Sequence, residues 1–234
     1  MQRFLFGLAA FFCLVSLPIA HADVVWVGGT SDDVFDEANW DLTGSSVTLI
    51  DENVSIDDDV VIGGGPFANN PVIPDLGGQV RLQIGDGFLL TVEGQINYAG
   101  NDGVGGAPGS TNGPTVNVVN GGAFNPFFVV HDVKVNIDGS SSSTFGGGGN
   151  PINLSTLNLE PGAVVTFLAE TPDQYIAEHL SKTSVLGAPA VDGVNLDIAA
   201  MGGAGSIITA IPEPASLTLT GLAGLALLMR RRRR

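Results

Sequence analysis

The chain has 234 residues, of which 24 are acidic and nine basic, and its formal net charge at pH 7 is −15. Six of the nine basic residues are Arg3 and the five C-terminal arginines, so residues 23–229 carry 3 − 24 = −21. Such a body repels nucleic acid and anionic lipid, which are bound mainly through Lys and Arg. This charge excludes nucleic-acid binding.

The N-terminus has the pattern of a secretory signal peptide. Arg3 precedes an apolar run over residues 4–17, and Ala20 and Ala22 form a small-x-small cleavage site, which predicts a mature chain beginning at Asp23. A retained anchor is the alternative, but the run is short for a membrane span. Cleavage removes Cys13, the one cysteine, and with it any disulfide or cysteine nucleophile. The expected partners at this end are signal peptidase and the Sec export machinery.

Residues 23–200 are rich in short segments in which apolar and polar residues alternate, a pattern typical of strands with one buried face. From Val116 to Val135 is 19 residues, from Val135 to Leu157 is 22, and from Val54 to Val80 is 26. Repeats of this length indicate stacked rungs of a solenoid. Residues 80–92 read as a strand, a Gly85-Asp86-Gly87 corner and a second strand. We therefore predict an all-β right-handed parallel β-helix; an antiparallel β-sandwich is the alternative.

The start of this body contains Trp26-Val27-Gly28-Gly29 and, further on, Ala38-Asn39-Trp40. Over residues 24–42 it resembles bacterial surface β-helix proteins of the autotransporter-repeat type. We expect both tryptophans to close the open end of the solenoid, which would otherwise expose apolar edges. Stacking of an exposed Trp40 on a sugar is the alternative.

One segment near the end of the body predicts a helix. Thr171, Pro172 and Gln174 suit an N-cap, a first-turn proline and a capping-box glutamine, so a short helix is expected over about 172–182. Strands are then expected within residues 185–198. The glycine-bearing stretch 201–211 is expected to be a linker.

The C-terminus carries three ordered signals. Prolines 212 and 214 favour extended backbone around Glu213. Residues 215–229 form an apolar run whose helix would be about 22 Å long, short of a bilayer core of about 30 Å. Five arginines then hold the end of the chain in the cytoplasm. The residues of the motif and of the membrane stop are Pro212, Glu213, Pro214, Arg230, Arg231, Arg232, Arg233 and Arg234.

Residues 212–234 resemble the PEP-CTERM sorting signal. The resemblance implies transient anchoring in the inner membrane of a Gram-negative bacterium through a transmembrane helix at about 215–229. It also implies cleavage near Pro212-Glu213-Pro214 by an exosortase, whose own residues do the chemistry, and export to the cell surface or extracellular matrix of a bacterium that makes exopolysaccharide. A simple tail anchor is the alternative.

Few residues of the body suggest a catalytic or metal-binding site. A calcium site at Asp57 and Asp59, with Asp58 pointing away, is weighed against a solvated turn, which we favour. His131 is interpreted as a strand residue and His179 as part of a solvated helix face. Without a catalytic constellation the sequence predicts no enzyme, no cofactor and no resident metal.

The sequence as a whole therefore predicts an exported structural or adhesive protein. A glycan-binding module is the first alternative and would show a row of exposed aromatic residues. A β-helix polysaccharide lyase or hydrolase is the second and would show carboxylates converging beside Arg81 or Lys134. Exopolysaccharide is a further expected partner.

Overall fold

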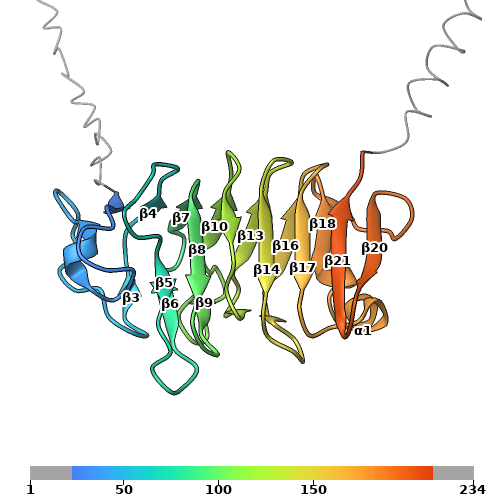
Figure 1. The fold of residues 1–234 in the computed structure, drawn as a ribbon, viewed down its shortest axis with the longest axis horizontal. Coiled ribbons are helices and arrows are strands. Elements are labelled where there is room, and N and C mark those ends of the chain that lie inside the picture. Colours follow the sequence, from blue (N-terminus) through green and yellow to red (C-terminus); the bar gives the residue numbers. More distant parts are fainter. Residues whose placement is uncertain (1–22, 213–234) are drawn as a thin grey trace, which may run out of the picture.

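The computed structural model describes residues 23–212, which form a β-solenoid of five rungs lying side by side along the long axis of the molecule (Figure 1). Each rung contributes one strand to each of three sheets. The strands of the five rungs are β3 (Ser55–Ile56), β4 (Val60–Ile62) and β5 (Val72–Ile73); β6 (Arg81–Ile84), β7 (Leu89–Val92) and β8 (Gln95–Tyr98); β9 (Gly103–Gly105), β10 (Thr115–Val118) and β11 (Ala123–Phe124); β12 (Val129–Val130), β13 (Lys134–Ile137) and β14 (Ser142–Phe145); and β15 (Ile152–Asn153), β16 (Thr156–Leu159) and β17 (Val164–Phe167).

Parallel pairing between successive rungs confirms the solenoid and shows that the β-sandwich alternative is wrong. Val116 lies opposite Val135, which lies opposite Leu157, so the 19- and 22-residue intervals each correspond to one rung. The corner at residues 85–87 also turns the chain from β6 in one sheet to β7 in another. The predicted interval of 26 residues from Val54 to Val80 is not a full rung, because Ser55 pairs with Gln83, which is 83 − 55 = 28 residues further on.

Alternation along the strands fills the core with stacked columns of like side chains. In one sheet Val60, Leu90, Val116, Val135 and Leu157 are in register and buried. Each aliphatic side chain thus packs on the same kind of side chain in the next rung, which gives dense apolar contact along the axis. The outward residues that follow them are Val61 in β4 and then the polar Thr91, Asn117, Asn136 and Asn158.

A second column is aromatic and runs towards the C-terminal end. The rings of Phe124 and Phe145 meet edge to face at 6.4 Å, and Phe145 stacks on Phe167 at 5.2 Å. Beyond the last rung the column continues into Tyr175 and His179, whose ring centroids lie 5.1 and 5.4 Å from that of Phe167. The column therefore ends in two polar rings, a phenol and an imidazole.

The N-terminal cap consists of β1 (Val24–Trp26), the 3-10 helix η1 (Glu37–Asn39) and β2 (Trp40–Asp41), with β1 and β2 antiparallel. Trp26 is fully buried and Trp40 is 6% exposed, and their rings meet edge to face at 5.0 Å. Their indole N–H groups donate to the carbonyls of Asn69 and Val34. The expected closing role of both tryptophans is confirmed, and burial removes Trp40 from any stacking on a sugar.

The C-terminal cap consists of α1 (Pro172–Glu178), η2 (Leu180–Lys182), β18 (Thr183–Val185), β19 (Ala188–Pro189), β20 (Leu196–Met201) and β21 (Gly205–Ala210). The predicted helix and its capping box between Thr171 and Gln174 are confirmed. Helix α1 packs against the β20–β21 hairpin (Figure 1).

The predicted linker 201–211 is wrong, because β21 occupies residues 205–210 and pairs antiparallel with β17 of the last rung. The glycines there serve the hairpin turn that joins β20 to β21, and Ile208 and Ala210 are buried against the body. Within residues 23–212 no helix has both the length and the apolar character needed to cross a bilayer.

Candidate functional site

A ladder of asparagines lies on the outer face of the sheet that contains β10, β13 and β16. Asn117, Asn136 and Asn158 are in register and flanked by buried aliphatic residues, so their amides face outwards. Asn136 Nδ2 donates to Asn117 Oδ1 at 2.9 Å, and Asn158 Nδ2 donates to Asn136 Oδ1 at 3.4 Å. Ser184 Oγ extends the ladder by donating to Asn158 Oδ1 at 3.0 Å. Each amide keeps a second N–H that these bonds do not use.

A depression of about 310 Å³ lies over this ladder and has an acidic edge formed by Asp138 and Glu160. Burial alone would raise the pKa of Asp138, but hydrogen bonds from the Ser141 and Ser140 side chains and from the backbone of Asn120 and Ser140 outweigh it and lower the pKa to about 2. Asp138 is therefore a fixed negative charge beside neutral amides. Such a surface can accept and donate hydrogen bonds to hydroxyl groups.

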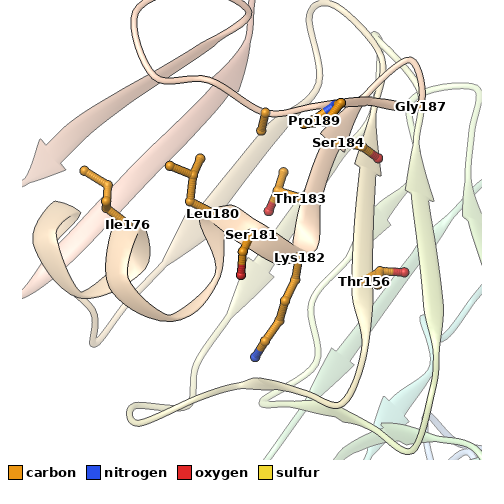
Figure 2. A pocket seen from close by; sticks show the side chains of 10 residues that line it. Thr156, Ile176, Leu180, Ser181, Lys182, Thr183, Ser184, Gly187 and Pro189 are labelled. Carbon is orange, nitrogen blue, oxygen red and sulfur yellow. The ribbon is translucent and has the colours of Figure 1, made fainter.

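A second pocket, of about 610 Å³, lies in the C-terminal cap between the helical segment and strands β18 and β19 (Figure 2). Hydroxyl and apolar side chains line it, and its one cation is already engaged, since Lys182 Nζ donates to Asn150 Oδ1 at 2.9 Å and to the carbonyl of Ile152 at 3.0 Å. Its lining residues are Thr156, Ile176, Leu180, Ser181, Lys182, Thr183, Ser184, Gly187, Pro189 and Ala190.

The same cap buries a carboxylate and an imidazole side by side. Glu170 is 1% exposed and His179 is fully buried, with Glu170 Oε2 2.8 Å from His179 Nε2. The interpretation of His179 as a solvated helix residue is wrong, because the last turn of α1 directs it onto Phe167, where its ring stacks at 12°. Glu178 brings a third ligand atom within 4.8 Å of the other two. Among residues 23–212 no other group of three or more acidic, histidine or cysteine ligands approaches so closely.

The charge of this cluster also affects the pKa of the neighbouring Tyr175. Burial raises the pKa of Tyr175 to about 12; a hydrogen bond with Thr183 opposes the rise, and the charge of Glu170 adds to it. The Tyr175 hydroxyl lies 2.8 Å from Thr183 Oγ1, which in turn donates to the carbonyl of His179. The phenol therefore stays neutral and holds the end of α1 against β18.

The three consecutive aspartates occupy the corner between β3 and β4, but each serves the fold. Asp57 Oδ1 accepts from Ser55 Oγ and Asp59 Oδ1 accepts from the backbone N–H of Leu89. Asp58 is buried, so the predicted solvated turn is wrong at this residue, and its Oδ2 accepts from Ser45 Oγ. Neither Asp57 nor Asp59 belongs to a group of three ligands within the described chain.

The residues considered for enzyme chemistry lie in ordinary surroundings. Arg81 donates from Nε to Gln83 Oε1 at 3.3 Å, and within residues 23–212 the one ion pair is that of His179 and Glu170, so no carboxylate lies within 4.0 Å of Arg81 or Lys134. His131 is not in a strand: it occupies a corner at φ 64°. Burial lowers the pKa of His131, and the charge of Arg81 lowers it further.

The predicted signal peptide with Ala20 and Ala22, and the sorting signal from Glu213 onwards with its apolar run and arginines, lie outside the described residues; Pro212 is the last residue described. Comparison of the chain with family models, with curated proteins and with solved structures gives no match. The fold and the local geometry therefore carry the functional argument.

Proposed function

We propose that this protein is an exported structural or adhesive component of the cell surface or extracellular matrix of a Gram-negative bacterium, sorted and processed by an exosortase. The observation that carries the proposal is the fit between the folded body and the two processing segments. The first strand begins at Val24, next to the proposed mature terminus Asp23, and the last strand ends at Ala210, two residues before Pro212. Each proposed cleavage therefore removes sequence without cutting into a strand of the body.

The surface of the body supports an extracellular structural role. Residues 23–212 contain 23 acidic residues against Arg81, Lys134 and Lys182, a formal charge of 3 − 23 = −20. With one ion pair among the described residues, most carboxylates have no cationic partner in the chain. Such a body stays apart from other anionic surfaces and is available to divalent cations in its surroundings.

The finer parts of the architecture belong to the proposal as well. We infer a right-handed winding of the solenoid, because about 98% of parallel strand–crossover–strand connections are right-handed. We also propose that residues 215–229 form the short transmembrane helix of the precursor, with Arg230–Arg234 on the cytoplasmic side. Because β21 ends so close to the motif, the exosortase would act within a few residues of the folded body.

A glycan-binding role is the second candidate, and the asparagine ladder favours it. Its unused amide hydrogens and the charged Asp138 lie in one depression on the flat outer face. Amide and carboxylate groups pair well with sugar hydroxyls. This mode differs from the aromatic row expected from sequence, since the exposed large apolar residues of the described chain are all Val, Leu or Ile.

Replacing Pro212-Glu213-Pro214 by three alanines tests the sorting proposal. We expect the variant to remain in the inner membrane at its full C-terminal length, while the wild-type protein reaches the surface in a shortened form. Immunoblotting of membrane, surface and medium fractions with an antibody against the body measures both. Unchanged release of the variant would contradict the proposal.

Glycan-array binding and a reducing-sugar assay on the full chain separate the remaining alternatives. Asn136→Ala should abolish any binding through the ladder, whereas Asn125→Ala, which alters an amide directly after β11 of another sheet, should leave it unchanged. Turnover of a polysaccharide would contradict the structural role and favour the lyase or hydrolase alternative.

A further inference from the structure

The buried cluster in the C-terminal cap has unsatisfied polar atoms. His179 Nδ1, His179 Nε2 and Glu170 Oε2 all lack a hydrogen-bond partner among the described residues. Nε2 and Oε2 lie 2.8 Å apart as an ion pair without hydrogen-bond geometry, and Nδ1 has no partner at all among the described residues. Leaving such groups unpaired in the interior costs about 1–3 kcal/mol each, and more for charged groups. The arrangement therefore lacks a partner that can satisfy an imidazole nitrogen and a carboxylate oxygen together.

The surrounding contacts hold these atoms in place. Stacking on Phe167 fixes the plane of the His179 ring, and the backbone N–H of Asn150 donates to Glu170 Oε1 at 3.0 Å, which leaves Oε2 free. Two ligand atoms on a tetrahedral ion lie about 3.4 Å apart when each ligand bond is about 2.1 Å, so this pair at 2.8 Å has to open by about 0.6 Å to share an ion. A shift of this size in the Glu170 side chain would place both buried atoms on a shared cation.

Glu178 supplies the third ligand atom and is the exposed member of the cluster. It is the last residue of α1, its side chain is exposed, and its carboxylate lies within 4.8 Å of the buried pair. The C-terminal end of a helix also carries partial negative charge, which favours a cation there. A small rearrangement of an exposed carboxylate would complete the site without disturbing the core.

We propose that Glu170, Glu178 and His179 bind a divalent transition-metal ion, for which Zn²⁺ is the best match. An imidazole and two carboxylates are a mixed nitrogen and oxygen donor set, which suits Zn²⁺, whereas Ca²⁺ and Mg²⁺ take oxygen ligands alone. The bound ion joins the segment after β17 to the end of α1. It thereby holds the C-terminal cap on the last rung of the solenoid.

Titration calorimetry with ZnCl₂ on the untagged full chain, purified in detergent and stripped with EDTA, tests the site. We expect one Zn²⁺ per chain, in the presence of excess CaCl₂ that occupies the other surface carboxylates, and a rise in the thermal unfolding midpoint on binding. Glu178→Gln changes an exposed residue and should weaken Zn²⁺ binding at least about tenfold while leaving the metal-free unfolding midpoint unchanged.

Two matched controls make the result decisive. His131→Gln removes the other histidine of the body, and Asp173→Asn removes another acid of α1; both should bind Zn²⁺ as the wild type does. The proposal is overturned if the wild-type chain shows no stoichiometric Zn²⁺ binding, if Glu178→Gln binds as tightly as wild type, or if His131→Gln loses the ion.

Discussion

The two caps close the ends of the same apolar solenoid in different ways. At the N-terminal end two tryptophans meet edge to face, and each indole N–H reaches a backbone carbonyl. At the C-terminal end the aromatic column finishes on His179, beside the buried Glu170, with several polar atoms left without partners. The N-terminal cap closes the core with apolar rings whose N–H groups are hydrogen-bonded. The C-terminal cap also buries an ionisable pair, which is not needed to cover the end of the core.

The difference separates residues that stabilise from residues that bind. Apolar packing with satisfied donors gives stability directly. A buried ionisable pair contributes little net stability but is costly to break, so its presence is a better indication of a site than of a fold requirement. The free energy of unfolding should therefore fall when buried side-chain volume is removed from the N-terminal cap. In the C-terminal cap it should fall when one member of the Glu170–His179 pair is removed.

Trp26→Ala should have the largest effect. Removing a fully buried tryptophan leaves a cavity at the open end of the core, so we expect the free energy of unfolding to fall by about 4 kcal/mol. Urea denaturation followed by circular dichroism measures it. Val27→Ala, at a neighbouring exposed position, is the control and should stay within about 0.5 kcal/mol of wild type. A loss below about 1 kcal/mol for Trp26→Ala would show that the tryptophans do not close the core.

Glu170→Leu should lower the free energy of unfolding by about 3 kcal/mol, because it leaves His179 buried without the carboxylate of its ion pair. The double variant Glu170→Leu/His179→Leu should recover part of this loss, since both polar partners are then gone. Urea denaturation in EDTA compares the three chains without metal. If the single variant is as stable as wild type, the contrast between the caps is lost.

Asp138→Ala probes a middle turn, where we expect a smaller loss of about 1–2 kcal/mol at pH 7. The carboxylate accepts hydrogen bonds from the backbone of Asn120 and Ser140 and from Ser140 Oγ. Its pKa is lowered from 3.8 to about 2 in the folded chain, so its stabilisation is present above pH 3.8 and is lost as the pH falls through 2. Urea denaturation at pH 7 and pH 2 should show the difference between variant and wild type shrinking in acid; a constant difference would contradict the assigned role.

Asp102→Asn should raise stability slightly, by about 0.5–1 kcal/mol at pH 7. Asp102 is buried and accepts the N–H of Val80 through Oδ1, but Oδ2 has no partner in the described chain. Burial raises its pKa, and the charge of Asp75 adds to the rise, so the charged form opposes folding at pH 7 and does so less as acid supplies the proton.

Glu170→Gln is the matched comparison for Asp102→Asn. Both substitutions neutralise a buried carboxyl group, but Glu170 forms an ion pair with His179, whereas Asp102 forms none with any described residue. We expect it to lower the free energy of unfolding in the same denaturation assay at pH 7. Destabilisation by both substitutions would show that the two buried carboxyls do not differ.

Local patterns in the sequence predict the parts of this fold that depend on local rules. The alternating segments around Val116, Val135 and Leu157, the spacing between them and the capping box at Thr171 are all readable along the chain. These features depend on the alternation of side chains along a strand or on the capping of a helix N-terminus. A few neighbouring residues are enough to define either of them. The tryptophans at the first cap are readable too, because large aromatic residues rarely stay exposed at the start of such a body.

Contacts distant in sequence account for what the sequence does not predict. His179 has a charged residue on its N-terminal side and looks solvated until Phe167 and Glu170 are seen to enclose it. The stretch 205–210 resembles a linker until β17 offers it an unpaired edge. Asp58 is buried, and the hydroxyl group that satisfies its Oδ2 comes from Ser45, 13 residues earlier. A helix that follows the last rung is the one sequence signal that could have drawn attention to His179, since such a helix covers the end of the core.

Intact-mass measurement of the protein recovered from the surface or medium of the bacterium that makes it tests the central claim most directly. The proposed processing predicts a chain that begins at Asp23, retains the whole body up to Ala210, and lacks Arg230–Arg234. Recovery of the native chain in the cytosol with both ends intact would contradict the proposed export and sorting.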